Sequence, residues 1–159
     1  MKVTLRPTSE QDEGFLRHLI IETAAAELGA SAWPEPLRSQ ILDMEYARRR
    51  HANRTNDPEV QSSVIQVDGV DAGWIVLVTM PDHLYLSEIM ILPELRGGGI
   101  GTVAIGQVLS KAGEAGKPVR LRVNVMNPRA ARLYERVGFR RIDGDEVQHV
   151  MECRPPTGS

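Results

Sequence analysis

A mostly apolar stretch that runs into a cluster of glycines at the start of a helix constrains this chain more than any other segment. His83–Leu92 is predicted to be a strand, and four of the five positions in Gly97–Gly101 are glycine. Glycines at a helix start let the backbone approach a ligand without a Cβ clash, and the free N–H groups there point outward. With the positive end of the helix dipole they form a site suited to phosphate or pyrophosphate. The alternative is a tight strand-to-helix turn that holds no ligand.

Two common phosphate-binding loops do not fit these glycines. A Walker-type loop needs Gly-Lys-Ser/Thr at its end, whereas Gly101 is followed by Thr102 and Val103. A dinucleotide fingerprint can be placed on Gly99, Gly101 and Ala104, but the next strand carries arginines where that fold has an acidic residue. A third kind of loop is needed to explain the segment.

The rest of the chain alternates strands and helices without a repeat or a linker. Apolar residues at three- and four-residue spacing predict helices, and alternating ones predict strands. Asp68-Gly69 predicts a tight hairpin, because both residues tolerate a positive φ. The predicted strands are Lys2–Arg6, Ser63–Val67, Val70–Met80, His83–Leu92, Val119–Val125, Phe139–Ile142 and Val147–Cys153, and the predicted helices end at Gly29, His51, Ala115 and Val137.

Two side-chain placements follow from the predicted helices. The basic run Arg48–His51 closes the second helix, where it complements the negative end of the dipole, and we expect it to be solvated. The third helix is expected to turn an apolar face inward, made of Ile100, Val103, Ala104, Val108 and Leu109.

Length and charge narrow the class of protein. The chain has 159 residues and a formal net charge of −2, which fits one soluble domain and lacks the basic excess of a nucleic-acid-binding protein. We expect one domain over residues 1–154, a disordered tail over 155–159, and a cytoplasmic location without a membrane span. The single cysteine, Cys153, is expected to be a small core or edge thiol. The four histidines have no ligand spacing, so no metal is expected.

Two motifs in order along the chain identify the third kind of loop. The first is Arg96-x-x-Gly99-x-Gly101 after the apolar strand, and the second is the run Val123–Phe139, with Asn-Pro-Arg-Ala, Leu-Tyr and Gly-Phe in sequence. Together they resemble the signature of the GNAT superfamily of N-acetyltransferases, over roughly residues 2–153. The resemblance implies one α/β domain: a mixed, mostly antiparallel sheet of six or seven strands with splayed central strands, flanked by about four helices.

The resemblance also implies acetyl-CoA as cosubstrate, held where the two central strands splay apart. The backbone of Ile89–Ile91 would hydrogen-bond the pantetheine arm like an added strand. The amides of Gly97–Gly101 would hold the pyrophosphate, with positive charge from Arg96 and a contact from Asn127. The expected cofactor-binding residues are Ile89, Met90, Ile91, Arg96, Gly97, Gly98, Gly99, Ile100, Gly101, Thr102, Asn127 and Tyr134.

Two side chains are candidates for the proton transfers of acyl transfer to an amine. The resemblance places Tyr134 near the thioester sulfur, and a phenol with a pKa near 10 can donate a proton to a departing thiolate. The other interpretation of Tyr134 is an aromatic core residue. Glu88 lies within an apolar strand, where burial would raise its pKa towards that of a general base; the alternative is a surface-facing acid. Backbone N–H groups near Ile89–Ile91 are candidate donors to the thioester oxygen.

We expect the acceptor to be a small primary amine that attacks directly in a ternary complex, in a pocket between the first two helices and the last hairpin. Candidate walls of that pocket are Trp33, Met44, Tyr46, His83 and Tyr85, with Trp33 alternatively a plug of the core. Two other functions stay open: a non-catalytic acyl-CoA-binding regulator, and an acetyltransferase that acts on a protein or RNA-linked amine. Neither nucleic acid nor a membrane is expected as a partner. A homodimer would follow the family habit, and acyl groups other than acetyl stay open.

Overall fold

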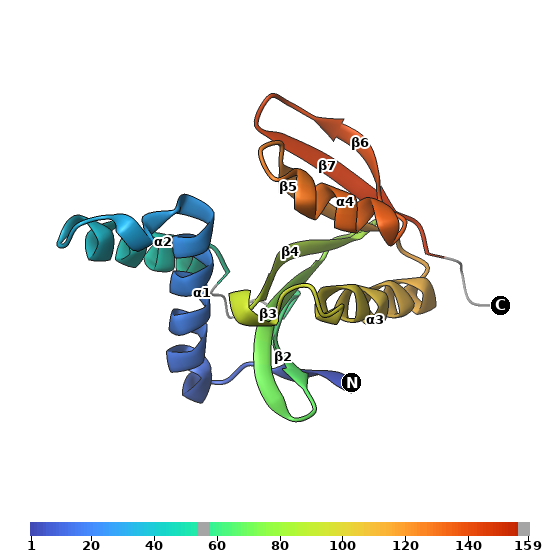
Figure 1. Ribbon diagram of the computed structural model, residues 1–159. Helices are drawn as coiled ribbons and strands as arrows, with labels where there is room; N and C mark the ends of the chain where they lie inside the picture. Colours follow the sequence, from blue (N-terminus) through green and yellow to red (C-terminus); the bar gives the residue numbers. More distant parts are fainter. Residues whose placement is uncertain (54–57, 156–159) are drawn as a thin grey trace.

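The computed structural model describes residues 1–53 and 58–155, in which one seven-stranded sheet carries helices on both faces (Figure 1). The strands are β1 (Val3–Pro7), β2 (Val60–Val67), β3 (Val70–Thr79), β4 (Leu84–Ile91), β5 (Val119–Asn124), β6 (Arg140–Gly144) and β7 (Gln148–Cys153). The helices are α1 (Glu13–Leu28), α2 (Leu37–Asn53), α3 (Ile100–Ala115) and α4 (Pro128–Arg136), with short 3-10 turns at Glu10–Asp12, Ala30–Ala32 and Pro93–Leu95. The predicted α/β class is confirmed. The predicted disordered tail lies, apart from Pro155, outside the described residues.

The sheet is built from two antiparallel halves. Its strand order is β1-β2-β3-β4-β5-β7-β6, and every neighbouring pair is antiparallel except β4–β5, which is parallel. Parallel neighbours need a crossover, and here the crossover is α3. Figure 1 shows β5, β6 and β7 turning away from β2 and β3, with β4 between the two halves.

Alternation along the strands places apolar side chains on both faces of the sheet. On one face, α3 packs against strand residues that include Ile65, Ile75 and Leu86. On the opposite face, α1 packs against Trp74, Val76 and Met90. Cys153 is buried in the α3 layer, as predicted.

The predicted element ends are confirmed where glycine determines them. Gly29 and Gly116 adopt the left-handed conformation at the ends of α1 and α3, with φ of 63° and 68°. Asp68 and Gly69 have φ of 51° and 83°, as a two-residue turn of type I′ requires. No helix in the described ranges is both long and apolar enough to span a bilayer.

Two side-chain predictions are wrong. Val103 is 39% exposed rather than inward-facing, whereas Ile105, which the prediction leaves out, is fully buried. Arg49 and Arg50 are not solvated, because their side chains are only 14% and 11% exposed. Both guanidinium groups turn back against α1 and the sheet, where they meet the carboxylates of Glu27 and Glu13.

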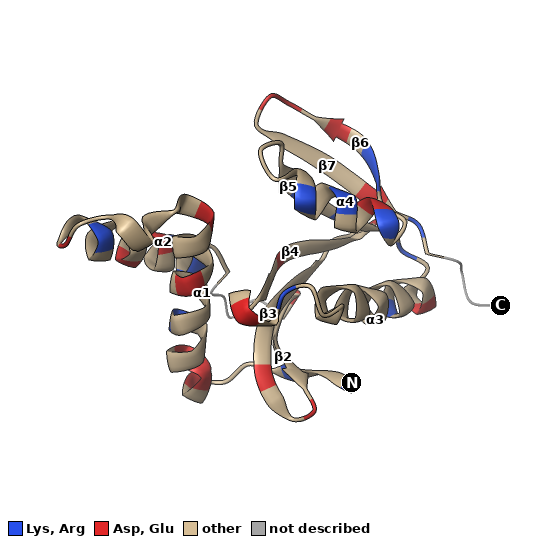
Figure 2. Ribbon diagram, in the orientation of Figure 1, with Lys and Arg blue, Asp and Glu red and all other residues tan. Residues whose placement is uncertain are grey.

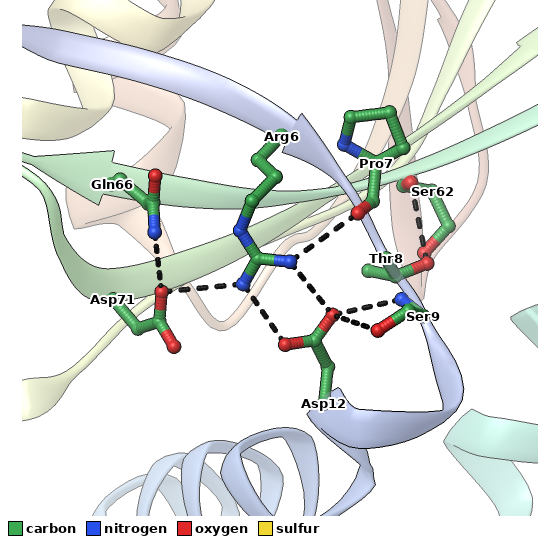
Figure 3. Close-up of polar contacts among 8 residues, drawn as sticks. All are labelled: Arg6, Pro7, Thr8, Ser9, Asp12, Ser62, Gln66 and Asp71. Carbon is green, nitrogen blue, oxygen red and sulfur yellow. Dashed lines mark hydrogen bonds and ion pairs between the residues drawn. The ribbon is translucent and has the colours of Figure 1, made fainter.

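A partly buried ion pair fixes the entry from β1 into α1 (Figure 3). Arg6 donates to both carboxylate oxygens of Asp12, at 3.0 and 2.9 Å, and more weakly to Asp71 at 3.4 Å. Asp12 Oδ2 also accepts from the backbone N–H of Ser9 at 2.8 Å. These donors hold the pKa of the Asp12 carboxyl below its usual range, with the Arg6 hydrogen bonds as the main cause.

Asp12→Ala is expected to lower the free energy of unfolding by about 2 kcal/mol at neutral pH, because it leaves the Arg6 guanidinium without its bidentate partner. The depressed pKa means that this stabilisation is present above the unfolded pKa of about 3.9 and is lost as the pH falls through the folded value. Urea unfolding at several pH values measures the effect. Asp71→Ala is the matched control, since it removes the longer, more exposed Arg6 contact together with the hydrogen bond from Gln66 but leaves the bidentate pair intact; equal losses in the two variants would contradict the assignment.

Candidate functional site

The two central strands, β4 and β5, separate midway along β4. The parallel pairing between β4 and β5 ends at Leu86 opposite Leu121, although β4 continues to Ile91. Beyond Leu86, the side of β4 that faces β5 has no strand partner among the described residues. An unpaired strand edge offers backbone donors and acceptors to an extended ligand. The predicted splay is therefore present, and Ile89–Ile91 lie along it.

A β-bulge marks the point where the strands separate. In the pairing of β3 with β4, Val76 lies opposite Glu88 and Leu77 lies opposite Leu86, so Ser87 is an extra residue. A bulge bends its strand and increases the local twist. Because it follows directly on the last residue that pairs with β5, it turns the rest of β4 away from that neighbour.

The glycine loop leads from the end of β4 into α3. Gly97 and Gly99 both have φ of 84°, where L-residues with a side chain are strained, and a Cβ built on either would meet nothing within 4 Å. The amides of Gly97, Gly98 and Gly99 have no acceptor in the described part of the chain, and the first bond of α3 runs from the Val103 N–H to the Gly99 carbonyl at 3.1 Å. The loop is therefore open and lined with N–H donors at the positive end of a helix, as an anion site requires.

Arg96 brings positive charge to this loop. The Arg96 Nε donates to the Ile91 carbonyl at 3.3 Å, which ties the loop to the end of β4. Figure 2 shows basic residues along α4, and the side chain of Leu133 on α4 comes within 3.9 Å of a Cβ built on Gly101. Thr102 is exposed in the first turn of α3, where its hydroxyl is accessible to an anion held by the loop.

Asn127 caps α4. Its Oδ1 accepts from the backbone N–H of Ala130 at 3.2 Å, and Pro128 fills the first helical position, as predicted. The cap uses the side-chain oxygen, so the Nδ2 group of Asn127 is left free to donate to a cofactor.

Glu88 lies on the β4 face that turns toward α1. It shares that face with Met90, which is two residues along the strand and packs against α1. Burial raises the pKa of the Glu88 carboxyl to about 7, against the opposing effect of the Arg49 charge. A carboxyl with a pKa near 7 exchanges protons readily at neutral pH, which is what a general base needs.

Tyr134 approaches from the other face of the sheet. It packs with the α3 layer, and its ring meets Phe139 edge-on with centroids 5.8 Å apart. Burial, together with the nearby charge of Glu88, raises the pKa of the Tyr134 phenol to about 12. The predicted match between the pKa of the phenol and that of a thiol depends on the ordinary phenol value near 10, and the pKa of Tyr134 lies above it. The phenol therefore stays protonated at neutral pH and can serve as a donor.

The structure brings two of the five predicted acceptor walls, Tyr85 and Tyr46, to the α1 side of the sheet, where Glu88 lies. The pKa of the Tyr85 phenol is raised by burial and by the charge of Glu88, so the two side chains lie close enough to interact. Trp33 packs in the small cluster between α1 and α2, as a plug of the core. Tyr46 packs against the cluster on the α1 face of the sheet that includes Met90, and its hydroxyl donates to Glu13 on α1 at 2.8 Å. His83 pairs with its neighbour Asp82 at 2.7 Å, and Met44 is exposed.

Three residues next to Glu88 are not predicted by the sequence analysis. Ser87 Oγ donates to Asn53 Oδ1 at 2.7 Å, and Arg49 Nη1 donates to Met90 Sδ at 3.6 Å. Asn53 and Arg49 belong to α2, far away along the chain, and no local pattern predicts which strand residue a helix end will contact. The two polar interruptions in an apolar strand, Ser87 and Glu88, are the one signal that the sequence offers.

The residues present fit coenzyme A. The unpaired edge of β4 suits an extended pantetheine arm, and the open amides of Gly97–Gly99 suit the pyrophosphate. Both features lie at the same end of β4, as one continuous ligand requires. In the described ranges, no three His, Cys, Asp or Glu side chains gather in a way that could hold a metal ion.

Sequence comparison places the chain among acetyltransferases. Residues 22–139 match the profile of the Acetyltransferase (GNAT) family. An uncharacterized N-acetyltransferase of Mycobacterium tuberculosis is 31% identical over 109 residues, which cover 67% of this chain and 69% of the relative. An uncharacterized N-acetyltransferase of Methanocaldococcus jannaschii is 33% identical over 82 residues; the match spans 51% of this chain and only 36% of that longer protein.

Solved structures share the fold at low identity. The PaiA N-acetyltransferase of Thermoplasma acidophilum, in complex with coenzyme A, matches with a TM-score of 0.75 at 20% identity. The match covers 97% of this chain and 99% of the PaiA chain. The ribosomal-protein-S18-alanine N-acetyltransferase of Escherichia coli has a TM-score of 0.69 at 16% identity, covering 99% and 97%. A spermidine N-acetyltransferase chimera from Vibrio cholerae has a TM-score of 0.66 at 20% identity, covering 98% and 96%. With its motifs, fold and profile match in agreement, the chain belongs to the GNAT acetyltransferase family.

Proposed function

We propose that this chain transfers the acetyl group of acetyl-CoA to the primary amine of a small acceptor, by direct attack in a ternary complex. The observation that carries the proposal is the separation of β4 from β5 beyond Leu86, next to an open glycine loop and between Glu88 and Tyr134. The cosubstrate supplies an activated acetyl thioester. This chain supplies the groups that bind it, orient it and move protons.

Each residue has a distinct part in the proposal. The amides of Gly97–Gly101 hold the pyrophosphate, and the exposed edge of Ile89–Ile91 aligns the pantetheine arm. Glu88, on the sheet face that α1 covers, takes the proton from the acceptor amine directly or through a water. Tyr134, on the sheet face that α3 covers, gives a proton to the departing sulfur. The two groups sit on opposite faces of the sheet, so one can serve the amine that adds to the thioester carbonyl and the other the sulfur that leaves the tetrahedral intermediate.

The acceptor is proposed as a small amine, although neighbours with this fold are named for acceptors of more than one kind. One neighbour is named for spermidine and another for an alanine of ribosomal protein S18. A panel containing a polyamine, free amino acids, an aminoglycoside and an alanine-terminated peptide, read by release of free thiol, tests the class. Transfer to the peptide alone would overturn the small-acceptor part of the proposal and favour a protein acceptor.

Tyr134→Phe tests whether the chain is an enzyme or a CoA-binding regulator. We expect kcat to fall by about 100-fold, because the phenol proton is lost, while the affinity for acetyl-CoA measured by calorimetry stays within about twofold. The ring and its contact with Phe139 are retained in this variant. Unchanged turnover would remove Tyr134 from the proton transfers. A wild-type protein that binds acetyl-CoA but acetylates no amine of the panel would favour the regulator.

A further inference from the structure

The end of α2 is attached to the bulge of β4 by a buried amide. Ser87, the extra residue of the bulge, donates from Oγ to Asn53 Oδ1 at 2.7 Å. Asn53 is 8% exposed, and its Nδ2 donates to the Arg49 carbonyl at 3.0 Å. Both ends of the amide are therefore used, so the side chain of Asn53 has one orientation. The bulge is held from outside the sheet as well as by its own strand pairing.

A second contact from the same helix lies on the other side of Glu88. Arg49, one turn before Asn53, donates from Nη1 to Met90 Sδ at 3.6 Å. The guanidinium is itself fixed by Glu27 on α1 at 3.0 Å and by Glu45 on α2 at 3.1 Å. The helix end thus contacts β4 one residue before Glu88 and two residues after it.

The charges facing Glu88 are arranged around this clamp. Arg49 and Arg48 favour the ionised carboxylate, while Glu27 and Glu45 oppose it. Arg48 and Arg49 both pair with Glu45, so the carboxylate of Glu45 partly neutralises their positive charge before it acts on Glu88. No ion pair joins Glu88 to either arginine in the described part of the chain, and its carboxylate is left free to accept a proton.

The aromatic groups complete the surroundings. Tyr85 on β4 and Tyr134 on α4 both sense the charge of Glu88, and both phenols have a raised pKa, with burial as the larger cause. Both phenols are therefore neutral in the pH range in which Glu88 titrates. The balance of positive and negative charge around the Glu88 carboxylate is determined by the charged residues of α1 and α2.

We propose that Asn53 and Arg49 are positioning residues for Glu88: the end of α2 clamps β4 on both sides of the carboxylate and holds it in place for the acceptor amine. The inference rests on the proposed function, in which Glu88 is the general base. The same contacts join α2, and through Arg49 also α1, to β4, the strand that is proposed to border the cofactor.

Ser87→Ala removes the link to Asn53 and is expected to lower kcat by about tenfold, because small displacements of a reacting group are costly. The KM for acetyl-CoA is expected to stay within about twofold, and Ser87→Thr, which keeps the hydroxyl, restores kcat. Ser62→Ala is the matched control, since Ser62 Oγ also makes one side-chain hydrogen bond within the sheet, from Trp74 Nε1 at 2.8 Å, but lies on β2. Equal kcat in Ser87→Ala and wild type, or equal loss in Ser62→Ala, would overturn the proposal.

Arg49→Gln tests the electrostatic half of the clamp without depending on turnover. Carbon-13 NMR of labelled glutamate carboxyls follows the titration of Glu88, identified by its loss in Glu88→Gln. Removing the positive charge is expected to raise the Glu88 midpoint by about half a pH unit or more, and Arg49→Lys to restore most of it. An unchanged midpoint in Arg49→Gln would overturn the role of Arg49. If instead the midpoint shifts but Glu88→Gln leaves turnover intact, Glu88 is not the base and the failure lies in the proposed function.

Discussion

Gly99→Glu is expected to weaken acetyl-CoA binding by about 100-fold or more. The substitution puts a carboxylate at the helix start where phosphate charge is proposed to sit, and charges about 4 Å apart near a protein surface repel by several kcal/mol. It also forces a side chain onto a backbone with φ of 84°, which glycine adopts freely and other residues resist. Calorimetric titration with acetyl-CoA measures the loss directly.

Gly106→Glu supplies the matched control on the same helix. Gly106 is exposed, has an ordinary helical φ, and a Cβ there meets nothing within 4 Å. The same charge at this position should leave the affinity within about threefold, and replacing a mid-helix glycine should, if anything, stabilise α3. Equal affinities of wild type and Gly99→Glu would leave the glycines as a turn alone, whereas no binding by the folded wild type would remove the basis of the acetyltransferase proposal.

The fold could be predicted to the extent that local chemistry determines it. Gly29 and Gly116 end helices because a left-handed residue is needed there, and Asp68-Gly69 makes a hairpin because both positions have positive φ. The glycine loop is recognisable for the same reason, since clustered glycines weaken a helix start and suit a place where a ligand approaches the backbone closely. Such signals lie within a few residues of the feature they specify.

The parts that could not be predicted depend on contacts distant in sequence. Arg49 and Arg50 read as a solvated helix end, because periodicity does not show that α1 supplies carboxylates to cover them. Spacing alone places Val103 inward, but its side chain lies beyond the edge of the α3 face that the sheet covers. The bulge at Ser87 likewise needs the register with β3, which no single strand contains.

Glu88→Gln is expected to lower kcat by about 100-fold or more at pH 8 and to leave acetyl-CoA binding unchanged, because an amide cannot accept the amine proton. In the wild type the carboxylate is the active form. Since burial raises the pKa of Glu88 to about 7, the rate should rise with pH through about 7 and level off above it. The variant should lack this rise. Glu114→Gln, an exposed glutamate on α3, should behave as wild type.

The same raised pKa makes Glu88 costly to the fold, which separates a catalytic role from a structural one. Between the unfolded pKa of about 4.3 and the folded value, the native state holds a proton that the unfolded chain releases, so this group lowers stability as the pH rises. Glu88→Gln should therefore match wild type near pH 4 and exceed its free energy of unfolding at pH 8, by up to about 3 kcal/mol. A structural glutamate would lose stability when replaced. A variant that is more stable and inactive can be explained only if the carboxylate is retained for its chemistry.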